Sequence, residues 1–312
     1  MDQSFKKIFW RIGQEITPDT FIQADNYICS QHNLIRRLIA GKYFGLLPQT
    51  EADAPSLTVE NILNNRDIYL KQLACYGTTS AGYLALFDDS LLDTLPKRQL
   101  SIPNTNAAAF YVVLRINPYE QVLIEPVDNT EAPEAHSAYE LCIRSLDQIS
   151  ANELAIIKVD NSMQSPAIDD GYIPPCMAIS SCSVLLDMFS TVKNLLTDIR
   201  SIIERRKDQF GKLMYPLTLL HYELNEFSLS EPPIALIRLI KKFMMTYHFF
   251  VADLRMIVMP DSIDEYNHND VAIIFKSLLS CLQEVKLMIG KVEIVIEEDF
   301  TQIGRASCRE RV

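Results

Sequence analysis

Glycine is scarce in this sequence, with 9 residues among 312. The chain contains no glycine-rich phosphate loop, no Gly-x-Ser-x-Gly elbow and no His-Glu-x-x-His zinc motif, and its five histidines are dispersed. We therefore expect no enzyme, no cofactor and no metal site. One catalytic alternative remains, a cysteine or histidine hydrolase in which Cys176 meets His268.

The sequence also lacks paired cysteines and a secretion signal. Its seven cysteines include no Cys-x-x-Cys motif, and residues 1–10 contain no long apolar run. This pattern predicts a cytoplasmic protein with free, buried thiols. The formal net charge of -11 disfavours nucleic acid as a partner, because phosphate binding requires a basic surface.

The C-terminal residues 302–312 read as foreign sequence. Back-translation of Gln302 to Val312 reproduces a common short-read sequencing adapter, so we exclude this segment from the interpretation of the fold. We expect residues 291–301 to begin a C-terminal domain that is largely missing from the chain.

The apolar pattern changes period in the segment from Asp169 to Ile179. Before it apolar residues mostly alternate, and after it they recur at helical spacing. Two successive prolines cannot continue a helix interior or a central strand. We therefore predict a hinge over residues 171–182, with Tyr172, Pro174 and Pro175 as its main residues, between a β-rich domain at 1–170 and a helical bundle at 183–290.

The β-rich half is expected to begin with a helix. Thr17, Pro18 and Asp19 form a helix-start signal, and Gly41 is a suitable stop. Short β-favouring runs then suggest an antiparallel sandwich or barrel, with a tight hairpin turn at residues 117–119. The predicted strands are Arg66 to Tyr76, Gly82 to Phe87, Ala109 to Ile116, Gln121 to Glu125, Ala138 to Ile143 and Leu154 to Val159.

Four helices are predicted after the hinge. The first carries a coiled-coil seam that ends at Gly211, and the second starts after Pro216. The third starts at Ser230, and the fourth runs from Val271 to Gly290. The overall fold class is therefore α+β. The seam residues are Leu185, Phe189, Val192, Leu196, Ile199, Ile203 and Phe210.

The third predicted helix is apolar on more than one face. Each large side chain left in water costs roughly 2 kcal/mol, so we infer burial against another copy or a partner. A membrane span is the competing interpretation. Charged residues such as Arg238, Lys241 and Asp253 interrupt the run, so we expect no insertion into a membrane.

Three stretches resemble the type VI secretion baseplate subunit family TssK, also called ImpJ or VasE, and their order matches along nearly the whole chain. The stretches are Trp10, Gly13, Pro18, Phe21, Gln23, Asp25 and Tyr27; then Tyr172 to Ile179; and finally Tyr266 to Val271. Thr20 and residues 14–16 depart from the family pattern, which indicates a divergent branch.

The resemblance implies an adaptor for a phage-tail-like secretion machine, located in the cytoplasm at the inner face of the bacterial inner membrane. Its β "shoulder" would dock on other baseplate wedge subunits through Trp10, Phe21 and Tyr27, although Trp10 and Phe21 could equally be core residues. Its helical "neck" would form a homotrimer, and its C-terminal "head" would contact the membrane complex. The candidate trimer-interface residues are Phe189, Leu196, Ile203, Phe243, Met244, Tyr247 and Phe250.

Two further interpretations remain open. A phage baseplate or receptor-binding adaptor of related architecture is an alternative to the secretion adaptor. His268, Asn269 and Asp270 precede the last helix, and we interpret them as its N-cap and first turn rather than as metal ligands.

Overall fold

The computed structural model describes residues 6–13, 15–40, 43–49, 55–105, 107–124, 134–162, 165–252 and 266–291. The chain divides into two compact units. Unit 1 comprises Met1–Ser183 together with His268–Val271, and unit 2 comprises Val184–Asn267 and Ala272–Val312. Of the predicted start of a C-terminal domain at 291–301, only Lys291 is described, as the last residue of the final helix, and the adapter-like segment lies outside the described residues.

The first sheet of unit 1 is built around one long strand, β3 (Asp67–Thr78). Strand β2 (Leu57–Asn64) pairs with most of β3, while β1 (Gly45–Leu46), β4 (Leu84–Phe87) and β5 (Gln99–Ser101) pair with its two ends. All these pairs are antiparallel. The sequence analysis missed β1, β2 and β5.

The second sheet has the strand order β7-β6-β8-β9 and is antiparallel throughout. Its strands are β6 (Ala109–Ile124), β7 (Glu134–Arg144), β8 (Glu153–Asp160) and β9 (Ala167–Ile168). The predicted hairpin turn at residues 117–119 is wrong. Pro118 instead lies in a bulge of β6, and β7 pairs with β6 on both sides of that bulge.

Side chains from the two sheets pack against each other. The Phe87 ring of β4 lies 5.1 Å from the Tyr139 ring of β7, and the Tyr139 hydroxyl accepts a hydrogen bond of 3.2 Å from the Leu86 N–H. An added Cβ at Gly77 would lie 2.8 Å from the Leu154 side chain. Unit 1 therefore contains a sandwich core, as predicted. Its fully buried residues include Ile68, Leu70, Leu73, Phe87, Val112, Val113, Leu114 and Leu154.

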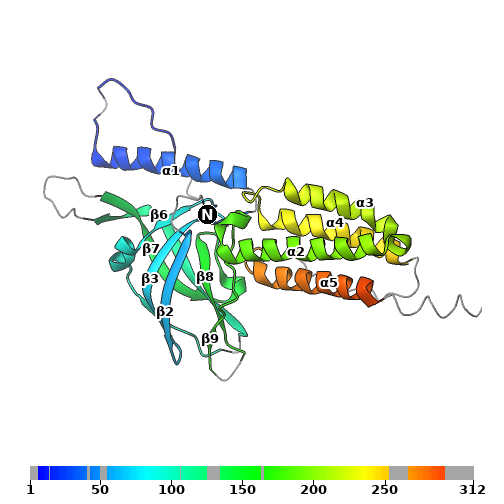
Figure 1. Cartoon of the computed structure of the whole chain (residues 1–312). Helices are drawn as coiled ribbons and strands as arrows, with labels where there is room; N and C mark the ends of the chain where they lie inside the picture. Colours follow the sequence, from blue (N-terminus) through cyan, green and yellow to red (C-terminus); the bar gives the residue numbers. More distant parts are fainter. Residues whose placement is uncertain are drawn as a thin grey trace, which may run out of the picture. The chain divides into compact units, whose positions relative to one another are not determined.

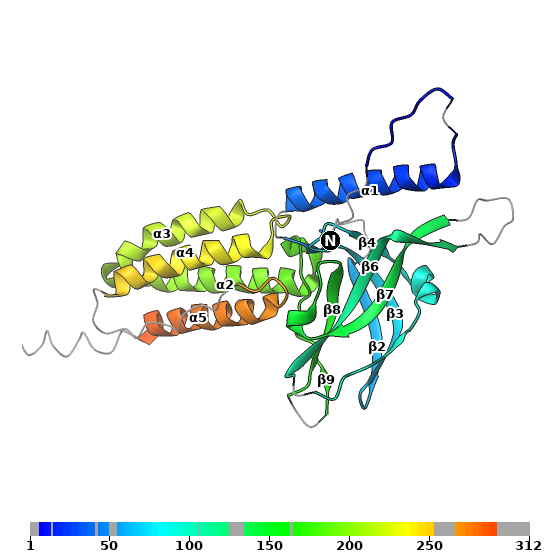
Figure 2. The ribbon, with the colours of Figure 1, turned by 180° about the vertical axis from the view of Figure 1, so that it is seen from behind.

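Helix α1 (Pro18–Ala40) precedes the sandwich in the chain and lies along its outside (Figures 1 and 2). Thr17 starts the helix as predicted: its backbone N–H donates to Thr20 Oγ1 at 3.3 Å, and its carbonyl accepts from the Thr20 N–H at 3.0 Å. Thr20, one of the departures from the family pattern, therefore supplies one side of a capping box.

In its described residues, unit 2 is a bundle of four helices that lie side by side (Figure 1). They are α2 (Ser183–Arg205), α3 (Lys207–Asn225), α4 (Pro233–Ala252) and α5 (Val271–Lys291). The α+β fold class is therefore confirmed. No helix in the described ranges is long and apolar enough to cross a membrane.

The break between α2 and α3 differs from the prediction. Gly211 does not end a helix, because both Gly211 and Pro216 lie inside α3. The helix instead breaks at Arg206, whose backbone is non-helical. The Arg206 guanidinium donates to the carbonyl of Gly290 at 2.8 Å and to that of Ile289, and these carbonyls lie at the end of α5. A cation interacts favourably with a helix C-terminus, so this contact stabilises the end of α5.

Candidate protein-interaction surfaces

Helix α1 buries its polar side and exposes its apolar side. Asn33 is the one described residue of the helix that is fully buried, and the helix is so close to the sandwich there that a Cβ at Gly82 would lie 2.3 Å from the Asn33 carbonyl oxygen. Cys29 and Ser30, on the same side, are half-buried. The contact of α1 with the sandwich is therefore made largely by small and polar residues.

The opposite side of α1 carries a stripe of exposed apolar side chains. At about 100° per residue these side chains fall on one half of the helix, away from Asn33. We call this set the α1 stripe: Phe21, Ile28, Leu34, Ile35, Leu38 and Ile39. An amphipathic helix normally turns its apolar side toward its own core. The reversed orientation marks the stripe as a surface for a partner.

The structure brings two of the three predicted wedge residues together. The Trp10 and Phe21 rings lie 6.4 Å apart, and both side chains are about half exposed, so neither is a core residue. Tyr27 is half-buried at the edge of the stripe. The capping signals predicted where α1 begins and ends, but not that its apolar side chains are left in solvent.

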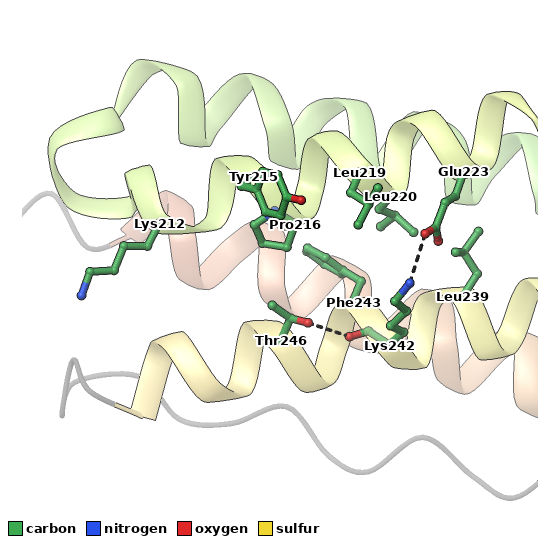
Figure 3. Close-up of a pocket in the computed structure, with 10 residues that line it drawn as sticks. All are labelled: Lys212, Tyr215, Pro216, Leu219, Leu220, Glu223, Leu239, Lys242, Phe243 and Thr246. Atoms are coloured by element: carbon green, nitrogen blue, oxygen red, sulfur yellow. Dashed lines mark hydrogen bonds and ion pairs between the residues drawn. The ribbon is translucent and has the colours of Figure 1, made fainter.

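A second candidate surface is a groove between α3 and α4, with a volume of about 500 Å³. Pro216 and Phe243 line it, and Tyr215, which is 79% exposed, forms part of its rim. Lys242 and Glu223 point toward each other across the groove and form an ion pair of 3.0 Å (Figure 3). Pro216 has no N–H to donate to the carbonyl four residues earlier, so the backbone of α3 is locally less satisfied beside this groove.

The predicted trimer-interface residues lie elsewhere in unit 2. Phe189 is half-buried and stacks on Phe227 at 5.7 Å. The side chain of Phe250 lies outside the described residues. The five others are buried inside the bundle of a single chain: Leu196, Ile203, Phe243, Met244 and Tyr247. Because their own chain already covers these five, they are not a free surface for another copy. Among the residues of α4 whose side chains the structure describes, Met245 and Phe249 are the large exposed apolar ones.

The predicted hinge residues are buried in unit 1. Tyr172, Pro174 and Pro175 are all buried. Strand β1 holds the segment through two backbone hydrogen bonds, from the Leu46 N–H to the Pro175 carbonyl at 2.8 Å and from the Met177 N–H to the Leu46 carbonyl at 3.0 Å. The connector is therefore tied to the sandwich, and bending at this point stays a prediction.

The thiol of Cys176 is poorly suited to catalysis. It is fully buried, its Sγ donates to the Pro174 carbonyl at 3.2 Å, and burial raises the pKa of the thiol well above its ordinary value. Since the thiolate is the nucleophile, Cys176 is unreactive in this state. His268, its suggested partner, is engaged with Phe44. Among the described residues, no three acidic, histidine or cysteine side chains are grouped as a metal site would require.

The fold is shared with TssK of the type VI secretion system. A crystal structure of TssK superposes with a TM-score of 0.66 at 16% identity, covering 90% of this chain and 69% of that one. A chain of the TssK-TssF-TssG baseplate subcomplex gives 0.58 at 14%, covering 91% and 99%. TssK from EAEC, in complex with a nanobody, gives 0.51 at 14%, covering 84% and 67%.

No family model matches the sequence, and no curated protein matches it either. The likeness to TssK is therefore a likeness of fold, carried by the structure rather than by sequence identity.

Proposed function

We propose that this chain is a non-enzymatic structural subunit of a type VI secretion baseplate. In this role it is an adaptor that joins other baseplate subunits to a membrane complex, in the cytoplasm at the inner face of the bacterial inner membrane. The shared fold supports the proposal, because two similar structures belong to baseplate assemblies. The α1 stripe carries it, because an exposed apolar helix face of this length requires a partner.

In the proposed mechanism the chain acts by holding its partners in fixed positions. The α1 stripe, with Trp10, contacts the wedge subunits, by analogy with the TssF and TssG that accompany TssK in a similar structure. The sandwich holds α1 in place through the close approach at Gly82. The bundle follows the sandwich in the chain, and we propose that the C-terminal head implied by the resemblance meets the membrane complex.

The wedge contact is tested by co-purification with TssF and TssG of the source organism. Ile28→Asp should abolish co-purification, because it places a charge in the α1 stripe. Ile22→Asp is the matched control: Ile22 is 55% exposed and Ile28 50%, but the two lie about 120° apart around the helix. If Ile28→Asp retains the partners, or if Ile22→Asp loses them equally, the stripe is not the contact.

We also propose that three copies associate through the exposed face of α3 and α4. The support is the apolar groove together with the exposed Tyr215 and Phe249 on its two helices. Light scattering on a sizing column should give three times the mass of one chain, and Tyr215→Asp with Phe249→Asp should give monomers. Leu287→Asp, on an exposed position of α5, should remain trimeric. A monomeric native chain would contradict this proposal.

A further inference from the structure

Unit 1 includes a short segment from the C-terminal half of the chain. His268–Val271 follows α4 in the chain and includes the first residue of α5, yet these four residues pack as part of unit 1. Three of them are each held by a different part of that unit. We call their binding site the α5 socket, and its walls are Phe44, Lys158 and Tyr172.

His268 occupies the first wall of the socket. Its Nε2 lies 2.6 Å from the Phe44 carbonyl oxygen and 3.1 Å from the Phe44 N–H, and the two rings meet edge to face at 4.7 Å. Burial lowers the pKa of the imidazole, and its hydrogen bond with the Phe44 backbone opposes this shift. This contact joins residues 224 positions apart in the chain.

Asn269 is held through its backbone. Its carbonyl accepts a hydrogen bond of 3.1 Å from the hydroxyl of Tyr172, a residue of the buried connector. Tyr172 in turn packs edge to face against Tyr111 of β6, with ring centroids 5.6 Å apart. The connector and the second sheet therefore both support this contact.

Asp270 provides the charged contact of the socket. Its Oδ2 lies 2.7 Å from Lys158 Nζ, and the two side chains are 3% and 16% exposed. Lys158 also pairs with Asp169 at 3.3 Å. Asp270 Oδ1 is buried and has no hydrogen-bond partner among the described residues. Asp270 immediately precedes α5, where a carboxylate also interacts favourably with the helix dipole.

An ion pair is not the most stable way to fill such a site. Apolar side chains of similar volume usually hold a buried position as well or better, because they need no desolvation of charge. When the socket opens, water solvates Lys158, Asp169 and Asp270. The charged contacts therefore lower the free energy of opening relative to an apolar plug.

We propose that the α5 socket is a latch: His268–Val271 can leave the rest of unit 1 and return while unit 1 stays folded, and the first turn of α5 unwinds as they leave. The three contacts define the closed state, and the buried Lys158–Asp270 pair makes that state reversible. The latch is independent of any assembly partner.

Hydrogen exchange of the whole chain, followed by mass spectrometry, tests the latch. The amides of Phe275 to Leu278 bond to the carbonyls of the first turn, so they report its opening. After correction for intrinsic rates, they should exchange at least tenfold faster than the core of β6 (Val112 to Leu114) and the centre of α2 (Val192 to Leu196). Equal rates at all three sites would mean that α5 opens only by global unfolding, and would overturn the proposal.

Three variants separate the charge from the packing. Lys158→Met should speed exchange at Phe275 to Leu278 at least tenfold, because it leaves Asp270 buried and unpaired. The apolar pair Lys158→Met with Asp270→Leu should exchange no faster than the native chain. Lys286→Met removes an ion pair of the same 2.7 Å length, but an exposed one, and should change nothing. If the apolar pair exchanges as fast as Lys158→Met, the ion pair does not govern the latch.

Discussion

Gly45→Ala should detach the buried connector from strand β1. Gly45 has φ +119°, and a Cβ there would lie 2.0 Å from the Pro175 carbonyl oxygen and 2.6 Å from the Cys176 nitrogen. Both obstacles are backbone atoms, which no rotamer change can move away. Alanine is therefore unfavourable at position 45 for two reasons: the positive φ strains its backbone, and the neighbouring backbone leaves no room for its Cβ.

The expected loss of stability follows from three contributions. A non-glycine residue held at positive φ costs about 1 to 2 kcal/mol. To bring the nearest contact from 2.0 Å to at least 3.0 Å, the two segments must separate. This separation breaks the hydrogen bonds from the Leu46 N–H to Pro175 and from the Met177 N–H to Leu46, at about 1 kcal/mol each. Together the free energy of unfolding should fall by about 3 to 4 kcal/mol.

Urea unfolding followed by far-UV circular dichroism measures this loss. Gly13→Ala is the control, because Gly13 has φ +81° but nothing within 4 Å of the added Cβ. It should cost no more than about 1 to 2 kcal/mol. If Gly45→Ala costs no more than Gly13→Ala, then the contact between β1 and the connector contributes little to the stability of unit 1, and the reasoning is refuted.

Three other substitutions or conditions have defined outcomes. Gly211→Ala should stabilise the bundle by about 0.5 to 1 kcal/mol in thermal unfolding, because Gly211 lies inside α3 and its Cβ would meet only the Lys207 side chain at 3.8 Å; a loss would refute this. Burial lowers the pKa of His221, so the folded state binds the imidazole proton less tightly than the unfolded state. The free energy of unfolding should therefore fall as the pH drops below about 6.5. His221→Leu should make this free energy less dependent on pH. Burial raises the pKa of Cys75 to about 12, so this thiol should resist a thiol reagent until the chain unfolds, whereas the half-buried Cys29 and Cys182 should react before it.

The trimer-interface residues show what periodicity can and cannot predict. The seam of α2 and the apolar run of α4 did predict helices, and these helices bury five of the seven residues. Periodicity does not say whether the covering surface belongs to the same chain. For Phe243 and Tyr247 it does, so a change of either to Asp tests the stability of the bundle rather than the association of copies.

Local signals also failed where tertiary contacts override them. Pro118 and Gly211 both look like breakers, yet a bulge accommodates the first within β6 and the second lies inside α3. Strand β2 was missed because its polar residues Glu60 and Asn61 interrupt the apolar alternation. The start of α5 was predicted from its capping residues, but the contact of Asp270 with Lys158, 112 positions away, has no local signal.

The membership of His268–Val271 in unit 1 has a consequence for the order of synthesis. Residues up to 183 leave the ribosome before the segment that fills the socket, and about 88 further residues must be translated before position 271 exists. At 5 to 20 residues per second this takes roughly 4 to 18 s. During that interval the nascent sandwich carries an open site with Lys158 and Tyr172 uncovered. The final closure of unit 1 is therefore a late, non-local step, of the kind that slows folding and gives a chaperone time to act.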